Sequence, residues 1–338
     1  MKFSTPIIKP KKKSVSINDF VAKRNKIAIL RETGGIGDIL MLRNLFEDFK
    51  SLAPDINLTF ACPYQYLDAV KDHPYVDEVV DFRKLNQEDY FMVYNVTNAC
   101  DNYELSKAPF GDLNRSDIWA AKCGIELKHH NMHINFKKEE IEDILQIISV
   151  LNPEQHPIVV FSPISAMPSK DLNTEQMLFV ANWLKNIGCK VLTTHLKTIS
   201  CLSDQGFEVL NTLTVRQWMS LIYVADYVVS VDTGTFHCAG GLNKPVTGIF
   251  SWADGLIYGK WYNCEIIQKH RINGQWECGP CYQWITCPKS ESPIKPCIQL
   301  TFDELEEGLI RMFSRWPHSK LPSFLYHRSK LSIFNYKK

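Results

Sequence analysis

The sequence lacks any apolar run long enough to cross a membrane. Runs such as Ile158–Phe161 are far shorter than the roughly 20 residues that span a bilayer. Lysines stand at positions 9, 11, 12 and 13, but polar residues follow them, where a secretory signal would have its apolar core. We therefore expect no transmembrane segment, and a location in the cytoplasm or peripherally at the inner membrane.

An excess of charge of one sign is also missing. Lys and Arg number 38 and Asp and Glu number 37, so that the formal net charge is +1. No global field then draws the molecule to nucleic acid or to a membrane, and any anion site has to be local. Hydrophobic residues make up 45% of the 338 residues, which excludes a chain that is disordered throughout and is enough for two packed domains.

The usual phosphate-binding fingerprints are absent from the one glycine-rich turn near the N-terminus. The segment 33–38 reads TGGIGD, with glycines at 34, 35 and 37. It is not a P-loop, because no Gly-Lys-Ser/Thr follows. It is a poor dinucleotide fingerprint as well, because Leu40 stands where the third glycine belongs. The glycines still allow backbone amides to approach a ligand closely.

Short apolar strands alternate with amphipathic helices along the chain, which predicts an α/β protein with mostly parallel sheets. Expected strands are 26–31, 58–61, 78–82, 91–96, 158–161, 190–194, 227–231 and 246–250. Expected helices begin near Asp38 and Gly234, cover 141–151, 173–187 and 215–225, and start at Thr301. We predict two doubly wound Rossmann-like domains over 26–153 and 154–316, preceded by a basic arm (1–25) and followed by a tail (317–338).

Open α/β sheets bind ligands outside the carboxyl ends of their strands, so residues just after each strand are the informative ones. Asp38 follows the first strand, and there it is either an N-cap or a catalytic base. After the strand 227–231 come Asp232, Thr233 and Gly234, and then His237 in the next helix. A hydroxyl, a glycine amide and a helix N-terminus suit a pyrophosphate.

Two further features carry chemistry. The loop 162–170 ends in Lys170, which could neutralise a phosphate at the same edge. Four of the eleven cysteines, Cys278, Cys281, Cys287 and Cys297, fall within twenty residues. Four thiolates opened by a Cys-x-x-Cys pair suit structural Zn²⁺ or mononuclear iron, with reduced thiols and disulfides as alternatives. The other seven cysteines are scattered singly and are expected to be buried.

Taken in order, GGIGD at 34–38, the loop ending in Lys170 and DTGTFHCAGGLNKPVTGIF at 232–250 resemble glycosyltransferase family 9, the ADP-heptose heptosyltransferases. The resemblance covers most of 26–312. It implies the GT-B architecture, with an N-terminal acceptor domain and a C-terminal nucleotide-sugar domain around a central cleft. By position, Asp38 corresponds to the general base and Lys170 to a phosphate-contacting lysine. Asp232, Thr233, Gly234 and His237 correspond to the donor motif, and Gly34, Gly35 and Gly37 to the acceptor-side loop.

The resemblance implies an inverting enzyme that moves a sugar from a nucleoside-diphosphate sugar such as ADP-heptose to an acceptor hydroxyl, with no metal needed for transfer. The acceptor stays open between a glycan or glycolipid of the lipopolysaccharide core, a protein, and a modified nucleic acid such as DNA. Lys170 is followed by Asp171-Leu172-Asn173 and not by the family's usual Trp-Pro, so the sugar also stays open. A nicotinamide-dependent oxidoreductase and a non-enzymatic metal-binding scaffold are the competing readings.

Overall fold

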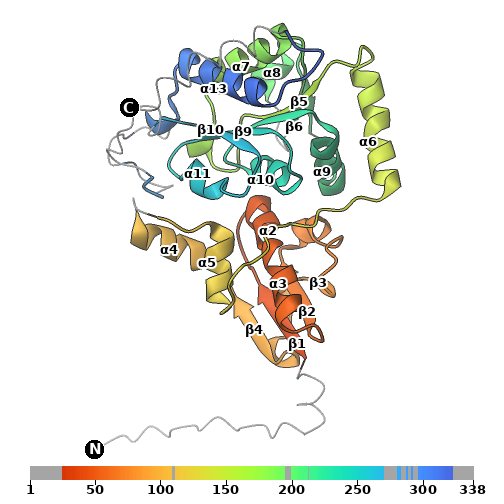
Figure 1. The fold of residues 1–338 in the computed structure, drawn as a ribbon, viewed down its shortest axis with the longest axis vertical. Coiled ribbons are helices and arrows are strands. Elements are labelled where there is room, and N and C mark those ends of the chain that lie inside the picture. Colours follow the sequence, from red (N-terminus) through yellow and green to blue (C-terminus); the bar gives the residue numbers. More distant parts are fainter. Residues whose placement is uncertain are drawn as a thin grey trace, which may run out of the picture.

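In the computed structural model the chain forms two stacked α/β units, one built on each of two parallel sheets (Figure 1). The structure describes residues 25–108, 111–194, 199–211, 213–269, 280–282, 287, 291 and 296–322. The fold class predicted from the sequence is confirmed: each sheet is wholly parallel and each is covered by helices. Within the described residues no helix is long and apolar enough to span a membrane.

The first sheet has four parallel strands in the order β3-β2-β1-β4. Its strands are β1 (Lys26–Leu30), β2 (Asn57–Cys62), β3 (Glu78–Asp81) and β4 (Met92–Asn95). β1 pairs with β2 on one side and with β4 on the other, so that Leu30 lies opposite both Ala61 and Asn95. The chain runs outward from β1 to β3 and returns to the far side of β1, which makes the β1–β4 junction a topological switch point.

The second sheet has six parallel strands in the order β10-β9-β8-β5-β6-β7. Its strands are β5 (Ile158–Ser162), β6 (Lys190–Thr194), β7 (Glu208–Leu210), β8 (Tyr227–Val231), β9 (Val246–Phe250) and β10 (Cys264–Gln268). β5, β8 and β9 are buried at every position, as expected of strands covered on both faces. The switch point lies between β5 and β8, where Ser162 pairs with Ser230.

Helices cover both faces of the second sheet. Val159 and Phe161 of β5 pack into the core under α7 (Thr174–Asn186), α8 (Ser200–Ser203) and α13 (Phe302–Arg315). Val160 packs into the opposite core, with α9 (Val215–Val224), α10 (Gly234–Gly241) and α11 (Gly255–Tyr258). That second core is continuous with the core of the first unit, so α10 and α11 form the side of the second unit that faces the first (Figure 1).

The helices of the first unit are α2 (Ile36–Leu42), α3 (Asn44–Leu52), α4 (Ala99–Lys107) and α5 (Arg115–Lys122). The longer helix α6 (Lys138–Leu151) follows and packs against α9 of the second unit. A salt bridge from Arg216 of α9 to Glu140 of α6 (2.7 Å) fixes that contact. The division at residue 153 stays a prediction.

Most of the predicted elements are present within one or two residues, including the capping box of α13, where Thr301 accepts from the Glu304 amide and Glu304 from the Thr301 amide. The sequence did not predict the helices α4, α5, α8 and α11 or the strands β7 and β10. α4 and α5 are weakly amphipathic and α4 carries mostly polar residues, so the helical period is faint. Five of the seven scattered cysteines are buried, as expected: Cys62, Cys100, Cys123, Cys189 and Cys238.

Candidate active site between the two sheets

The two predicted site segments of the second unit meet at its switch point. Ser162 ends β5, and Asp232 and Thr233 follow β8 directly. The Ser162 hydroxyl lies 2.8 Å from the hydroxyl of Thr235, which ties the β5 loop to the first turn of α10. The sequence-predicted segments 162–170 and 232–237 therefore share one edge of the sheet.

Lys170 and Asp232 form a salt bridge at this edge. The Lys170 ammonium lies 2.7 Å from Oδ2 of Asp232 and 4.9 Å from the centre of the Trp252 ring. Burial raises the pKa of Asp232, but the Lys170 charge and His237 outweigh it, so the pKa is held well below its usual range. Asp232 therefore stays ionised and holds the lysine, whose side chain is 17% exposed, at the edge of the site.

His237 is buried behind Asp232. Its Nε2 lies 3.8 Å from Oδ1 of Asp232, and its Nδ1 lies 3.1 Å from the hydroxyl of Tyr262. The two contacts hold the imidazole on both sides. His237 thus belongs to the same cluster as Asp232 and Lys170, in the position from which it can orient the carboxylate.

The glycine-rich turn of the first unit packs directly on this cluster. A Cβ added to Gly37 would lie 2.8 Å from Cδ2 of His237 and 3.5 Å from Cα of Gly234. A Cβ added to Gly234 would lie 2.3 Å from the Ile36 side chain. Helices α2 and α10 therefore meet end to end through two glycines, and the predicted acceptor-side and donor-side motifs come together.

The remaining glycines of the turn differ in role. Gly34 has a φ of +112°, and a Cβ there would lie 2.6 Å from both Arg31 Nη2 and Asp38 Oδ2. Only glycine fits that conformation and that space without strain. Gly35 is the N-cap of α2, and a Cβ there would meet nothing within 4 Å, so its backbone borders open space.

Asp38 is not a helix cap. It is the third residue of α2, whose N-cap is Gly35, and its carboxylate accepts from two arginines. Arg31 Nη2 lies 3.0 Å from Oδ2 and Arg115 Nη1 lies 2.7 Å from Oδ1. Burial raises the pKa of Asp38, but the charges of Arg115 and Arg31 lower it further than burial raises it. The carboxylate is thus ionised and fixed in orientation.

Arg115 links Asp38 to the second unit. It pairs with Glu104 (2.6 Å), and Glu104 accepts a hydrogen bond from the hydroxyl of Tyr258 in α11 (2.8 Å). The neighbouring Asn114 donates to the carbonyl oxygens of Ile257 and Tyr258. The orientation of Asp38 therefore depends on contacts that cross between the units.

Sequence reasoning missed Arg31, Arg115, Glu104, Tyr258 and Trp252. Arg31 carried a usable signal, since a basic residue directly follows the apolar run 27–30 at the ligand-binding edge of the sheet. Arg115 carried none, because it approaches Asp38 from 77 residues away in a helix that the sequence did not reveal.

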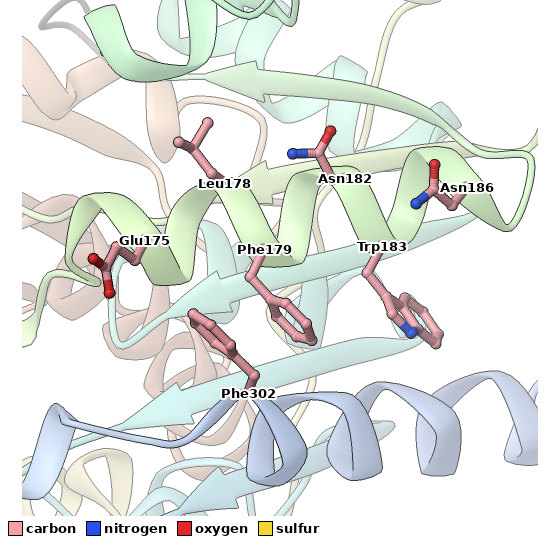
Figure 2. A pocket seen from close by; sticks show the side chains of 7 residues that line it. All are labelled: Glu175, Leu178, Phe179, Asn182, Trp183, Asn186 and Phe302. Atoms are coloured by element: carbon pink, nitrogen blue, oxygen red, sulfur yellow. The ribbon is translucent and has the colours of Figure 1, made fainter.

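Two hollows in the surface lie outside this cluster. A groove of about 380 Å³ on the outer face of the second unit runs between α7 and α13, with Phe179, Trp183 and Phe302 along its floor (Figure 2). It contains none of the predicted site residues. A pocket of about 490 Å³ lies at the switch point of the first sheet and is lined by Glu32 and Thr97, which follow β1 and β4.

The predicted cysteine site is only partly covered by the structure. Cys281, Cys287 and Cys297 are described and half-buried, whereas Cys278 lies outside the described residues. Among the described residues, no group of three or more His, Cys, Asp or Glu side chains could hold a metal ion.

The fold is shared with solved glycosyltransferases. A glycosyltransferase family 9 structure from Veillonella parvula is 12% identical and covers 86% of this chain and 97% of its own (TM-score 0.66). The iron-containing dodecameric glycosyltransferase TibC of enterotoxigenic E. coli is 14% identical, and the match covers 85% of this chain and 75% of TibC (TM-score 0.61). E. coli heptosyltransferase WaaC with ADP-2-deoxy-2-fluoro heptose is 15% identical, and the match covers 85% of this chain and 99% of WaaC (TM-score 0.53).

A comparison with curated protein sequences finds no match. The family model of glycosyltransferase family 9 (heptosyltransferase) matches residues 114–281. This range holds Lys170, Asp232 and His237, and leaves the glycine-rich turn with Asp38 outside it. By this match and by the two parallel sheets that it shares with the solved glycosyltransferases, the chain is a glycosyltransferase similar to family 9, the heptosyltransferases.

Proposed function

We propose that this glycosyltransferase takes a nucleoside-diphosphate sugar, ADP-heptose foremost, at the switch point between β5 and β8. The observation that carries the proposal is the convergence of Lys170, Asp232 and the N-terminus of α10 at that edge. A lysine and free helix amides suit a diphosphate. WaaC, which shares the fold, is described with an ADP-heptose analogue, which supports the same donor class here.

In this proposal Asp38 is the general base of an inverting transfer. The acceptor hydroxyl attacks the anomeric carbon and gives its proton to the Asp38 carboxylate, while the bond from that carbon to the diphosphate oxygen breaks. A single displacement of this kind inverts the anomeric configuration. Because its pKa is low, Asp38 is a weak base and takes the proton late, when the attacking oxygen has become acidic.

The leaving diphosphate carries away the electron pair of the broken bond and needs positive charge. Lys170, held by Asp232 and stacked over Trp252, lies where it can supply that charge. His237 fixes Asp232 from behind and touches the turn that carries Asp38. In this proposal His237 therefore keeps the donor site and the general base Asp38 at a fixed distance from each other.

Thermal unfolding with a panel of nucleotides tests the donor. ADP-sugars should raise the melting temperature, with the diphosphate ADP giving most of the rise, because ligands that bind only the folded state stabilise it. Incubation with an accepted donor and acceptor should then give a product whose anomeric configuration is opposite to the donor's, read by NMR coupling constants. Stabilisation by NAD⁺ with none by any nucleoside-diphosphate sugar would contradict the proposal, as would a product of retained configuration.

A structural metal at Cys278, Cys281, Cys287 and Cys297 is a separate proposal. Its support is the spacing of the four cysteines and the iron-containing description of TibC. The three described members do not form a ligand group among the described residues, so Cys278 and its neighbourhood are needed to complete any site. The predicted location, in the cytoplasm or peripherally at the inner membrane, likewise stays a prediction.

A further inference from the structure

Tyr258, the last residue of α11, is buried where the two units meet. It is 3% exposed, and the guanidinium carbon of Arg115 in the first unit lies 5.1 Å from the centre of its ring. Burial raises the pKa of the Tyr258 hydroxyl well above its usual value, so the hydroxyl keeps its proton. It donates that proton to Oε1 of Glu104, at 2.8 Å. Tyr258 is therefore a fixed hydrogen-bond donor, and not an acid or a base, at neutral pH.

The carboxylate of Glu104, which is buried, in turn holds Arg115. Its Oε1 accepts from Arg115 Nε (2.7 Å) and its Oε2 accepts from Arg115 Nη2 (2.6 Å), and such a bidentate pair fixes the plane of the guanidinium group. The other terminal nitrogen, Nη1, donates to Oδ1 of Asp38 (2.7 Å). Because the pair is bidentate, a rotation of the Glu104 carboxylate turns the guanidinium group and moves Nη1 away from Asp38.

The backbone of α11 holds the same arginine by a second route. Asn114 is buried and is the N-cap of α5, where its side chain accepts from the Ser116 amide. Its Nδ2 donates to the carbonyl oxygens of Ile257 (2.8 Å) and Tyr258 (3.1 Å). The first turn of α5, which begins with Arg115, is thereby tied to the C-terminus of α11.

The segment that carries Tyr258 starts at the proposed donor edge. It follows β9, and its second residue is Trp252, whose ring lies 4.9 Å from the Lys170 ammonium group. Gln268 of β10 makes three hydrogen bonds to backbone groups of 251–255, so this connection is rigid. One rigid piece of the second unit therefore contacts both the lysine at the donor edge and the residues that hold the base.

We propose that Tyr258 is a positioning residue of the transfer reaction, which holds the Asp38 carboxylate in one orientation through Glu104 and Arg115. The inference rests on the proposed function, in which Asp38 takes the acceptor proton. Asp38, Arg115 and Glu104 belong to the first unit and Tyr258 to the second, so both units build the base. The base is then in place only while α11 is docked on α4 and α5.

Tyr258→Phe removes the hydroxyl and leaves the ring. With ADP-heptose as the donor, kcat for release of ADP should fall about tenfold, the usual effect of losing one hydrogen bond to a charged group. KM for the donor and the affinity for ADP should stay as in the wild type. Tyr227→Phe is the matched control, because Tyr227 is also 3% exposed and its hydroxyl donates to the carbonyl oxygen of Trp316 (2.5 Å), at the start of β8 and away from the site. It should keep kcat within twofold of the wild type.

A double-mutant cycle separates positioning of the base from a general effect on the fold. Asp38→Asn lacks the base, so Tyr258→Phe should lower turnover no further in that background, because residues that act through one group are not additive. Losses that multiply, or wild-type turnover in Tyr258→Phe, would overturn the proposal. If Tyr258→Phe does not fold, Asn114→Ser takes its place with the same expectations, since serine caps a helix about as well as asparagine but is too short to reach α11.

Arginine side-chain NMR on the full chain tests the contact without any substrate. The Nε–H signal of Arg115, assigned by its loss in Arg115→Lys, should exchange slowly with solvent in the wild type, because this group donates to buried Glu104. Exchange should become at least several-fold faster in Tyr258→Phe and stay unchanged in Tyr227→Phe. An unchanged signal in Tyr258→Phe, together with an inactive Asp38→Asn, would overturn this inference alone, whereas normal turnover in Asp38→Asn would overturn the proposed base as well.

Discussion

Asp38→Asn removes a negative charge from between two arginines and leaves the size of the side chain unchanged. Asp38 has a 14% exposed side chain and pairs with Arg31 at 3.0 Å and Arg115 at 2.7 Å. Removing one member of a buried ion pair costs about 3–5 kcal/mol. Because Asp38 is partly exposed and an amide oxygen still accepts from an arginine, we expect about 3 kcal/mol. Melting temperature should then fall by roughly 5–10 °C.

Turnover should fall much further than this loss explains. A general base contributes about 10²- to 10⁴-fold, and the amide of Asn cannot take the proton. The assay is release of the nucleoside diphosphate at saturating donor, at a temperature where the variant is fully folded. ADP affinity should stay near normal, because Asp38 contacts the acceptor side of the site in this proposal.

Asp72 offers a matched control for the same chemistry away from the site. Its carboxylate is 13% exposed and also lies between two arginines, Arg43 at 2.9 Å and Arg216 at 3.2 Å. Asp72→Asn should cost a similar amount of stability, yet keep turnover within a few-fold of the wild type. Equal losses of turnover in the two variants would refute the base assignment, because the effect of Asp38→Asn would then be one of stability.

Three further outcomes are expected. Gly37→Ala places a methyl group 2.8 Å from the His237 ring and should lower stability by about 1–3 kcal/mol, whereas Gly35→Ala meets nothing within 4 Å and should be nearly silent in thermal unfolding. The pKa of Asp38 lies below the usual 3.8 in the folded state, so the stability that its ion pairs contribute is present above pH 3.8 and is lost as the pH falls through the lower folded pKa. A pH–rate profile should therefore show no acid limb from Asp38 above about pH 4. An acid limb near pH 6 that Asp38→Asn abolishes would contradict the assignment. Freshly purified, reduced protein should contain about one equivalent of zinc or iron by elemental analysis, reduced together with stability in Cys281→Ser; metal-free wild-type protein would exclude the site.

The strands were predictable because burial on both faces leaves near-continuous apolar runs, as in β5 (IVVFS) and β9 (VTGIF). The strand β10 was not predicted because its sequence, CEIIQ, carries a polar residue on each side of its apolar pair. The helix α4 was not predicted because most residues of its sequence, ACDNYELSK, are polar and give no clear apolar face. Its packing in the fold and the capping contacts around it, and not its own pattern, stabilise such a helix.

The sequence predicted the site residues that directly follow a strand. It did not predict those that reach the site through ion pairs between residues far apart in the chain. Lys170 and Asp232 were expected at one edge, and the structure pairs them at 2.7 Å. The N-cap alternative for Asp38 was wrong because α2 begins at Ile36, two residues before the aspartate. Of its two arginine partners, Arg115 lies in a helix whose position only tertiary packing reveals.

Calorimetric titration with ADP tests the central claim, that the edge between β5 and β8 is the donor site. Lys170→Met keeps the aliphatic stem over Trp252 and removes the ammonium group, and Lys185→Met removes an ammonium group from α7, which carries no part of the site. A donor site at this edge predicts that wild type and Lys185→Met bind ADP with equal affinity and that Lys170→Met binds it about tenfold or more weakly, since a charge-assisted bond to phosphate is lost. Equal affinity of all three proteins, or no binding of ADP to the wild type, would contradict it.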